Sequence, residues 1–123
     1  PCAEILRKTG LLPKANRLAG DLTLLERKRL EVARALASSP RLLLLDEIAG
    51  GLTEREALEL VELIAEIHAA GTTLVWIEHV VHALLRAIGR LVVINFGAVI
   101  LDGEPQAVME SSEVQRIYMG VEA

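Results

Sequence analysis

Apolar positions recur at helical spacing in two segments of the chain, and each segment begins with a pair of residues that can cap a helix. In the first segment Thr23 precedes Glu26 by three positions, and in the second Thr53 precedes Glu56 in the same way. A threonine followed three residues later by a glutamate is the spacing of a capping box, in which each side chain accepts a hydrogen bond from the other residue's backbone N–H. The apolar side chains that follow lie on one face of each helix. The sequence therefore predicts a long amphipathic helix after each threonine.

Two short apolar runs follow these helices. Residues 42–45 are four leucines, and residues 72–77 are rich in β-branched side chains. A short apolar run without polar alternation is typical of a strand buried on both faces of a parallel sheet. Because strands alternate with helices through the middle of the chain, the sequence predicts an α/β layered sheet with right-handed crossovers.

The rest of the chain is predicted to form short helices and one hairpin. Gly10 and Pro13 end the first helix, and Pro105 begins another at the first position, where its missing N–H is not needed. Phe96 and Gly97 form the turn of the hairpin between two apolar runs. The short helices cover residues 2–12, 80–88, a segment from 105 and 113–119, and the hairpin strands cover 91–94 and 99–101.

Composition narrows the class of protein. The 123 residues suffice for one small domain, and 52% hydrophobic with 24% charged residues is typical of a globular chain. The net charge of −4 argues against a nucleic-acid-binding protein, which usually has a basic face. No apolar run reaches the roughly 18 residues that a membrane-spanning helix needs.

Candidate chemistry lies where the two predicted strands end. Asp46 and Glu47 follow the first run, and Glu78 and His79 follow the second. Ligands of open α/β sheets bind beyond the carboxyl ends of the strands, so both pairs are expected to face one crevice. There an aspartate can hold Mg²⁺, a glutamate can orient or deprotonate water, and an imidazole can reach a terminal phosphate. The structural alternative is that the carboxylates begin a loop and that His79 only supports the fold.

These features resemble, in order and spacing, the nucleotide-binding subunits of ABC transporters. The segment of 29–36 is similar to the one that follows the LSGGQ signature of that family, and His79 matches its switch histidine. Residues 42–47 resemble the Walker B strand of the family, and residues 48–53 resemble its D-loop. Residues 95–100 resemble its late hairpin, and residues 102–105 resemble the turn that follows. Similarity to the branched-chain amino acid uptake subgroup comes from Glu31 and from residues 77–79 and 118–120.

The resemblance implies an α/β fold, a partial P-loop NTPase (ABC ATPase) fold with a mostly parallel sheet and flanking helices. No G-x-x-x-x-G-K-[ST] motif is present, so the phosphate-loop strand is expected to be lacking. Residues 1–123 are expected to form a single C-terminal portion of a nucleotide-binding domain. Its parts would be the end of the helical subdomain with the signature helix in 1–40, the Walker B strand to the late hairpin in 41–103, and C-terminal helices in 104–123.

The resemblance also implies six site residues in an intact parent that binds ATP and Mg²⁺. Catalysis would need Glu47 and His79, the metal would be held by Asp46, and contacts to ATP would come from Thr23, Glu26 and Thr53.

The signature motif departs from the family, because Leu24 and Leu25 stand where glycines let the backbone approach a phosphate. Ile48 replaces the usual proline after the catalytic glutamate. The alternative function is therefore a non-catalytic binding or regulatory module of the same fold. An unrelated α/β domain, such as a response-regulator-like module, would need an acidic pocket near its first strand, and the sequence has no such cluster there.

The implied function is that of a fragment of an ATP-hydrolysing subunit that powers an ABC importer for a small solute such as a branched-chain amino acid. The implied partners are a second ATPase subunit, membrane-spanning permease subunits and the missing N-terminal half, and not a nucleic acid. The implied location is cytoplasmic, at the inner face of the cell membrane through the permease. Without the phosphate loop the chain alone is expected to bind ATP poorly and to be inactive. Its uncovered sheet edges predict self-association.

Overall fold

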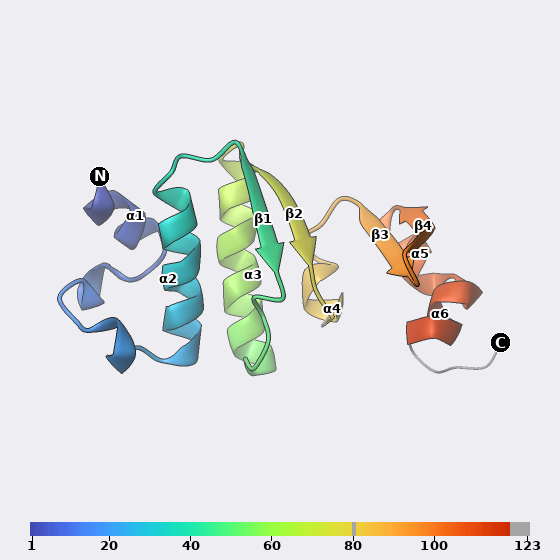
Figure 1. Cartoon of the computed structure of the whole chain (residues 1–123), viewed down its shortest axis with the longest axis horizontal. Coiled ribbons are helices and arrows are strands. Elements are labelled where there is room, and N and C mark those ends of the chain that lie inside the picture. The colour runs from blue at the N-terminus through green and yellow to red at the C-terminus, as the bar shows by residue number, and fades with distance from the viewer. Residues whose placement is uncertain (80, 119–123) are drawn as a thin grey trace. The chain divides into compact units, whose positions relative to one another are not determined.

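The structure is a computed structural model that describes residues 1–79 and 81–118 (Figure 1). The chain divides into two compact units, residues 1–83 and 84–123. The prediction that all residues belong to one domain portion stays a prediction.

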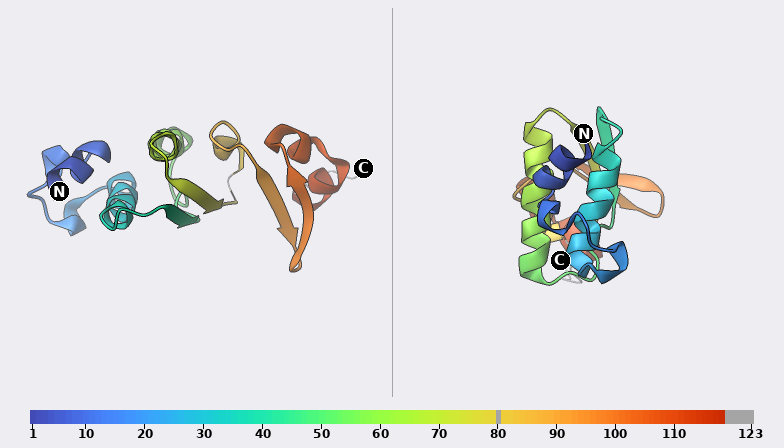
Figure 2. Two further views of the ribbon diagram at one scale, coloured as in Figure 1. Left: turned by 90° about the horizontal axis from the view of Figure 1, so that it is seen from above. Right: turned by 90° about the vertical axis from the view of Figure 1, so that its left-hand side faces the viewer.

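Among its described residues, the first unit contains three helices of seven or more residues. These are α1 (Cys2–Lys8), α2 (Leu24–Leu36) and α3 (Glu54–Ala69). Figure 2 shows α2 and α3 running side by side, and two short 3-10 turns at Leu12–Lys14 and Ala19–Asp21 connect α1 to α2. The first helix is shorter than predicted, because the Thr9 hydroxyl donates to the carbonyl of Ile5 and Gly10 turns with a φ of 74°.

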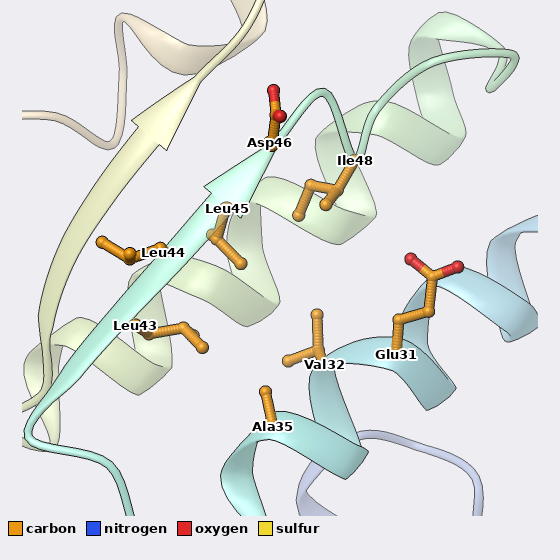
Figure 3. Close-up of a pocket in the computed structure, with 8 residues that line it drawn as sticks. All are labelled: Glu31, Val32, Ala35, Leu43, Leu44, Leu45, Asp46 and Ile48. Carbon is orange, nitrogen blue, oxygen red and sulfur yellow. The ribbon is translucent and has the colours of Figure 1, made fainter.

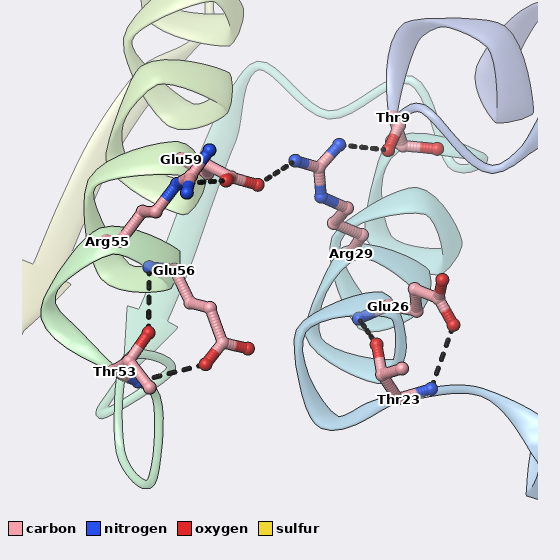
Figure 4. Close-up of polar contacts among 8 residues, drawn as sticks. All are labelled: Thr9, Thr23, Glu26, Arg29, Thr53, Arg55, Glu56 and Glu59. Carbon is pink, nitrogen blue, oxygen red and sulfur yellow. Dashed lines mark hydrogen bonds and ion pairs between the residues drawn. The ribbon is translucent and has the colours of Figure 1, made fainter.

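Both predicted capping boxes are present (Figure 4). The backbone N–H of Thr23 donates to Glu26 Oε2 at 2.8 Å, and the Glu26 N–H donates to the Thr23 hydroxyl at 3.3 Å. In the second box, the N–H of Thr53 donates to Glu56 Oε1 and the Glu56 N–H to the Thr53 hydroxyl, each at 3.2 Å. The two long helices therefore begin where the sequence predicts them.

The strands β1 (Leu42–Asp46) and β2 (Thr73–Ile77) pair in parallel, with α3 between them in the chain. One face of this pair packs on α2 and α3, and the buried core there contains Val32, Leu43, Leu45, Ile48, Leu60, Leu63, Ile64 and Ile67. The opposite face is open. Its apolar side chains are between 51% and 69% exposed, and they belong to Leu42, Leu44, Val75 and Ile77. The prediction that the two strands are buried on both faces is thus wrong for this chain, because nothing among the described residues covers that face.

The predicted helix of residues 80–88 is mostly replaced by turns. The helix α4 spans only Val81–Leu84, and the N–H of Ala87 then donates to the carbonyl of Leu84 three residues back. That hydrogen bond closes a tight turn instead of extending the helix. Residue 80 lies outside the described residues.

The second unit contains the predicted hairpin and two helices. The hairpin strands β3 (Leu91–Asn95) and β4 (Ala98–Gly103) pair antiparallel, with an irregularity after Val93. The helices α5 (Pro105–Glu110) and α6 (Ser112–Tyr118) follow, and Val93, Val108 and Val114 form the core. One of the two sheets is therefore parallel and the other antiparallel. Residue 119, the predicted end of the last helix, and residue 120 of the family resemblance lie outside the described residues.

Candidate functional site

The two strands of the parallel pair end at the same edge. Asp46 is opposite Ile77 in the register, and the Glu47 N–H donates to the Ile77 carbonyl at 2.8 Å, which extends the pairing by one residue. Because parallel strands point the same way, the residues after β1 and after β2 are brought together. This juxtaposition of Glu47 and His79 is the one that the sequence predicts.

The Glu47 and His79 side chains contact each other at this edge. His79 Nε2 lies 2.6 Å from Glu47 Oε1, and the two side chains are 79% and 51% exposed, in that order. A polar contact between side chains this open to water contributes little to folding stability. Both groups are therefore accessible to a ligand.

Glu47 has an unusual backbone conformation for a side chain of its size. Its φ of 52° lies in the left-handed region, and its carbonyl accepts from the N–H of Gly50 at 3.3 Å. A Cβ atom added at Gly50 would lie 3.4 Å from that carbonyl oxygen, which is a close van der Waals contact. Left-handed conformations of non-glycine residues cost about 1–3 kcal/mol and cluster at functional sites.

Glu78 is a member of the site to which the sequence reasoning gave no role. Its Oε2 accepts a hydrogen bond from the Ala49 N–H at 3.2 Å, and its Oε1 accepts from the His79 N–H at 3.1 Å. The only sequence signal was a carboxylate directly before the histidine at a strand end. Its partner 29 residues away was not visible in the sequence.

Asp46 is exposed at the end of β1. It lies at one end of a groove of about 250 Å³ between β1 and α2, which Figure 3 shows. The groove is lined by Glu31, Val32, Ala35, Leu43, Leu44, Leu45, Asp46 and Ile48. Most of its lining side chains are apolar and suit a hydrophobic group, and the carboxylates in the lining belong to Glu31 and Asp46. In the described part of the chain no group of three or more His, Cys, Asp or Glu residues is placed to hold a metal ion.

The other three predicted site residues cap helices. Thr23 and Glu26 form the capping box of α2, and Thr53 caps the start of α3. Glu26 also pairs with the ammonium of Lys14. The hydrogen bond from Lys14, together with that from the Thr23 N–H, holds the pKa of the Glu26 carboxyl below its ordinary value. No hydrogen bond or ion pair in residues 1–79 and 81–118 joins these three side chains to Glu47 or His79.

Arg29, from the cationic run at the start of α2, connects three helices (Figure 4). Its guanidinium donates to the Thr9 carbonyl and to Glu59 Oε2, each at 3.3 Å, and Arg55 approaches Glu59 Oε1 at 3.8 Å. These contacts give Arg29 a role in packing α1, α2 and α3 together. Its positive charge is therefore partly neutralised by Glu59 within the fold.

Comparison with known proteins gives relatives over nearly the whole chain. The high-affinity branched-chain amino acid transport ATP-binding protein LivG of Escherichia coli K12 is 39% identical over 119 residues, which are 96% of this chain and 47% of LivG. The corresponding protein BraF of Pseudomonas aeruginosa is 37% identical over the same shares of the two chains. No protein-family model matches the chain.

A solved structure gives the same result for the fold. The ADP conformation of MJ1267, an ATP-binding cassette of an ABC transporter, superposes with a TM-score of 0.91 at 30% identity, over 98% of this chain and 49% of that one. The chain thus spans about half the length of the relatives that it matches.

Proposed function

Because the chain is a homologue of ABC transporter ATP-binding subunits over nearly its whole length, we propose that it serves as part of such a subunit and helps to hydrolyse ATP to power solute import. The resemblance to this family and to its branched-chain amino acid subgroup, expected from the sequence, is confirmed by the relatives and by the fold. The names of LivG and BraF support branched-chain amino acids as the solute.

The observation that carries this proposal is the contact of 2.6 Å between Glu47 Oε1 and His79 Nε2. A carboxylate that can accept a proton from water and an imidazole that can donate to a phosphate oxygen therefore lie next to each other. In the proposed mechanism Glu47 orients or deprotonates the attacking water, and His79 contacts the terminal phosphate. Each would exchange its present partner for a ligand atom, which their exposure allows.

Asp46 is proposed to hold Mg²⁺ together with the phosphates of ATP. A single exposed carboxylate fits this metal, because Mg²⁺ is usually bound by one or two carboxylates plus substrate phosphates and water. When bound, the ion would neutralise charge on the phosphate oxygens.

Thr23, Glu26 and Thr53 are proposed to contact ATP at the N-terminal ends of α2 and α3. Free backbone N–H groups at a helix start attract anions, which supports this proposal for the two long helices. Leu24 and Leu25 narrow the approach at α2 and favour contact through the Thr23 hydroxyl rather than through the backbone.

The proposed partners are a second ATPase subunit, permease subunits and the remaining half of the parent. No helix in the described residues is long and apolar enough to span a bilayer. The proposed location is the cytoplasmic face of the membrane, through contact with the permease subunits. Self-association of the isolated chain is also proposed, and its support is the open apolar face of β1 and β2.

A non-catalytic module of the same fold is not favoured. LivG and BraF carry the words ATP-binding protein in their names, and Glu47 and His79 lie in contact in the present structure. An idle site has no evident need for this arrangement at the solvent-exposed end of two strands.

The test is Glu47→Gln in the full-length subunit that carries this chain together with a phosphate loop. Removing the proton acceptor should lower ATP turnover by about 100-fold or more while ATP affinity measured by calorimetry stays the same. The matched control is Glu62→Gln on the exposed side of α3, which should leave turnover unchanged. Normal turnover in the Glu47→Gln protein would refute the proposed role.

A further inference from the structure

Glu78 connects the two loops that carry Glu47 and His79. It follows directly after β2, and its half-buried carboxylate accepts two backbone hydrogen bonds. One oxygen takes the N–H of Ala49 at 3.2 Å, and the other takes the N–H of His79 at 3.1 Å. A single side chain thereby joins the loop after β1 to the residue after β2.

Ala49 depends on this acceptor. The residue is only 5% exposed, so water has little access to its N–H. A buried N–H without an acceptor is strongly disfavoured. The neighbouring turns use other groups, because the Gly50 N–H donates to Glu47 and the Leu52 N–H donates to the Ala49 carbonyl. The Ala49 N–H donates instead to the Glu78 carboxylate.

The same loop holds Glu47 in its left-handed conformation. A backbone of this kind persists only where the surrounding contacts impose it. On the N-terminal side, the Glu47 N–H donates to the Ile77 carbonyl. On the C-terminal side, the Ala49 N–H donates to Glu78. Together the two bonds fix the direction in which the Glu47 side chain leaves the loop.

We propose that Glu78 is a positioning residue, whose carboxylate holds the loop of residues 47–51 against the end of β2 so that Glu47 faces His79. This inference rests on the proposed function for its importance, because the alignment matters for hydrolysis only if Glu47 and His79 are catalytic. The geometry requires two acceptor oxygens, one for each N–H. Glutamine has only one acceptor oxygen and would turn an NH₂ group toward one of the two donors.

The test compares Glu78→Ala and Glu78→Gln with the intact chain by NMR spectroscopy. The readout is the nuclear Overhauser contact between the side-chain protons of Glu47 and the ring of His79, together with hydrogen exchange of the Ala49 amide. In Glu78→Ala the contact should disappear and Ala49 should exchange about tenfold faster or more. In Glu78→Gln the contact should weaken. Contacts between Leu44 and Val75 report whether the strands stay paired.

The control is Glu62→Ala on α3, which removes an exposed glutamate away from the site and should leave both signals unchanged. An unaltered contact between Glu47 and His79 in both Glu78 variants would overturn the inference. If Glu78→Ala does not fold, the test rests on Glu78→Gln. A weakened contact between Glu47 and His79 in that variant would support the inference, and an unaltered contact would overturn it. This result is independent of ATP turnover. Loss of the contact alongside normal turnover in the Glu47→Gln subunit would refute the proposed function and leave the positioning role standing.

Discussion

At the scale of single residues, positive φ angles have different origins at different positions. Glu47 and Phe96 both adopt left-handed backbone, with φ values of 52° and 48°. Glu47 lies in a loop that hydrogen bonds hold on both sides. Phe96 lies in the hairpin turn, where it is fully exposed and is followed by Gly97 with a φ of 77°. Such a two-residue turn matches the twist of the strands but favours Asn or Gly at its first position.

Phe96→Asn should stabilise the protein by about 0.5–1 kcal/mol, because asparagine tolerates the left-handed region better than phenylalanine does. Since the ring is fully exposed, its loss sacrifices no buried area. Denaturant unfolding of the two proteins measures the difference. Phe96→Ala is the matched control, since it removes the ring without relaxing the backbone. A Phe96→Asn protein no more stable than the Phe96→Ala protein would show that the turn is not strained.

At the scale of elements, the sequence predicted features whose partners lie close together in the chain, and it did not predict features that depend on distant parts of the fold. The capping boxes of α2 and α3 could be predicted because all their partners lie within four consecutive residues. The exposure of Leu44 could not be predicted. An apolar run indicates that both faces of a strand suit burial, but it does not show whether another element packs on each face. The short α4 was missed for a related reason, since an apolar pattern continues through residue 88 although the chain turns after Leu84.

The start of α5 provides an element whose stability should depend on pH. The Glu104 carboxylate accepts from the N–H groups of Ala107 and Gln106, at 2.9 and 3.1 Å, and these two hydrogen bonds hold its pKa below the ordinary value. A carboxyl with a lowered pKa in the folded state contributes stability above its unfolded pKa, and the contribution is lost as pH falls through the folded pKa. The cap should therefore be complete near neutral pH and disappear in acid.

Glu104→Ala should accordingly be less stable than the unaltered chain near pH 7, and the two stabilities should converge below the ordinary glutamate pKa of 4.5. Urea unfolding across this pH range measures both curves. Glu62→Ala serves as the control and should show no comparable convergence. Parallel curves for the Glu104→Ala and unaltered chains at all pH values would contradict the capping role.

At the scale of the whole molecule, topology made part of the site predictable. Asp46, Glu47 and His79 could be assigned to one edge because parallel strands end together. The partnership of Glu78 with Ala49 could not, because it depends on the conformation of a loop that no short motif encodes. The roles of the six predicted site residues in binding and catalysis stay predictions.

The open face of the parallel strands determines how the isolated chain should behave in solution. Leu44 and Val75 are opposite each other in the register and are 69% and 51% exposed, so they form the middle of an uncovered apolar surface. The open edges of a two-stranded sheet also offer unpaired backbone groups to another copy. Burying apolar surface is worth roughly 25 cal/mol per Å², which favours association through this face. We therefore expect the isolated chain to sediment as a dimer or larger species.

Replacing both Leu44 and Val75 by lysine should shift the sedimentation coefficient toward that of the monomer, because two like charges would have to be buried against a second copy. Circular dichroism should show that the helices remain, since both side chains point away from the core. Leu18→Lys is the matched control, because Leu18 is 76% exposed and lies outside the strands. It should leave association unchanged. A monodisperse monomer of the unaltered chain would contradict this prediction, and an unchanged oligomer of the double variant would place the association on another surface.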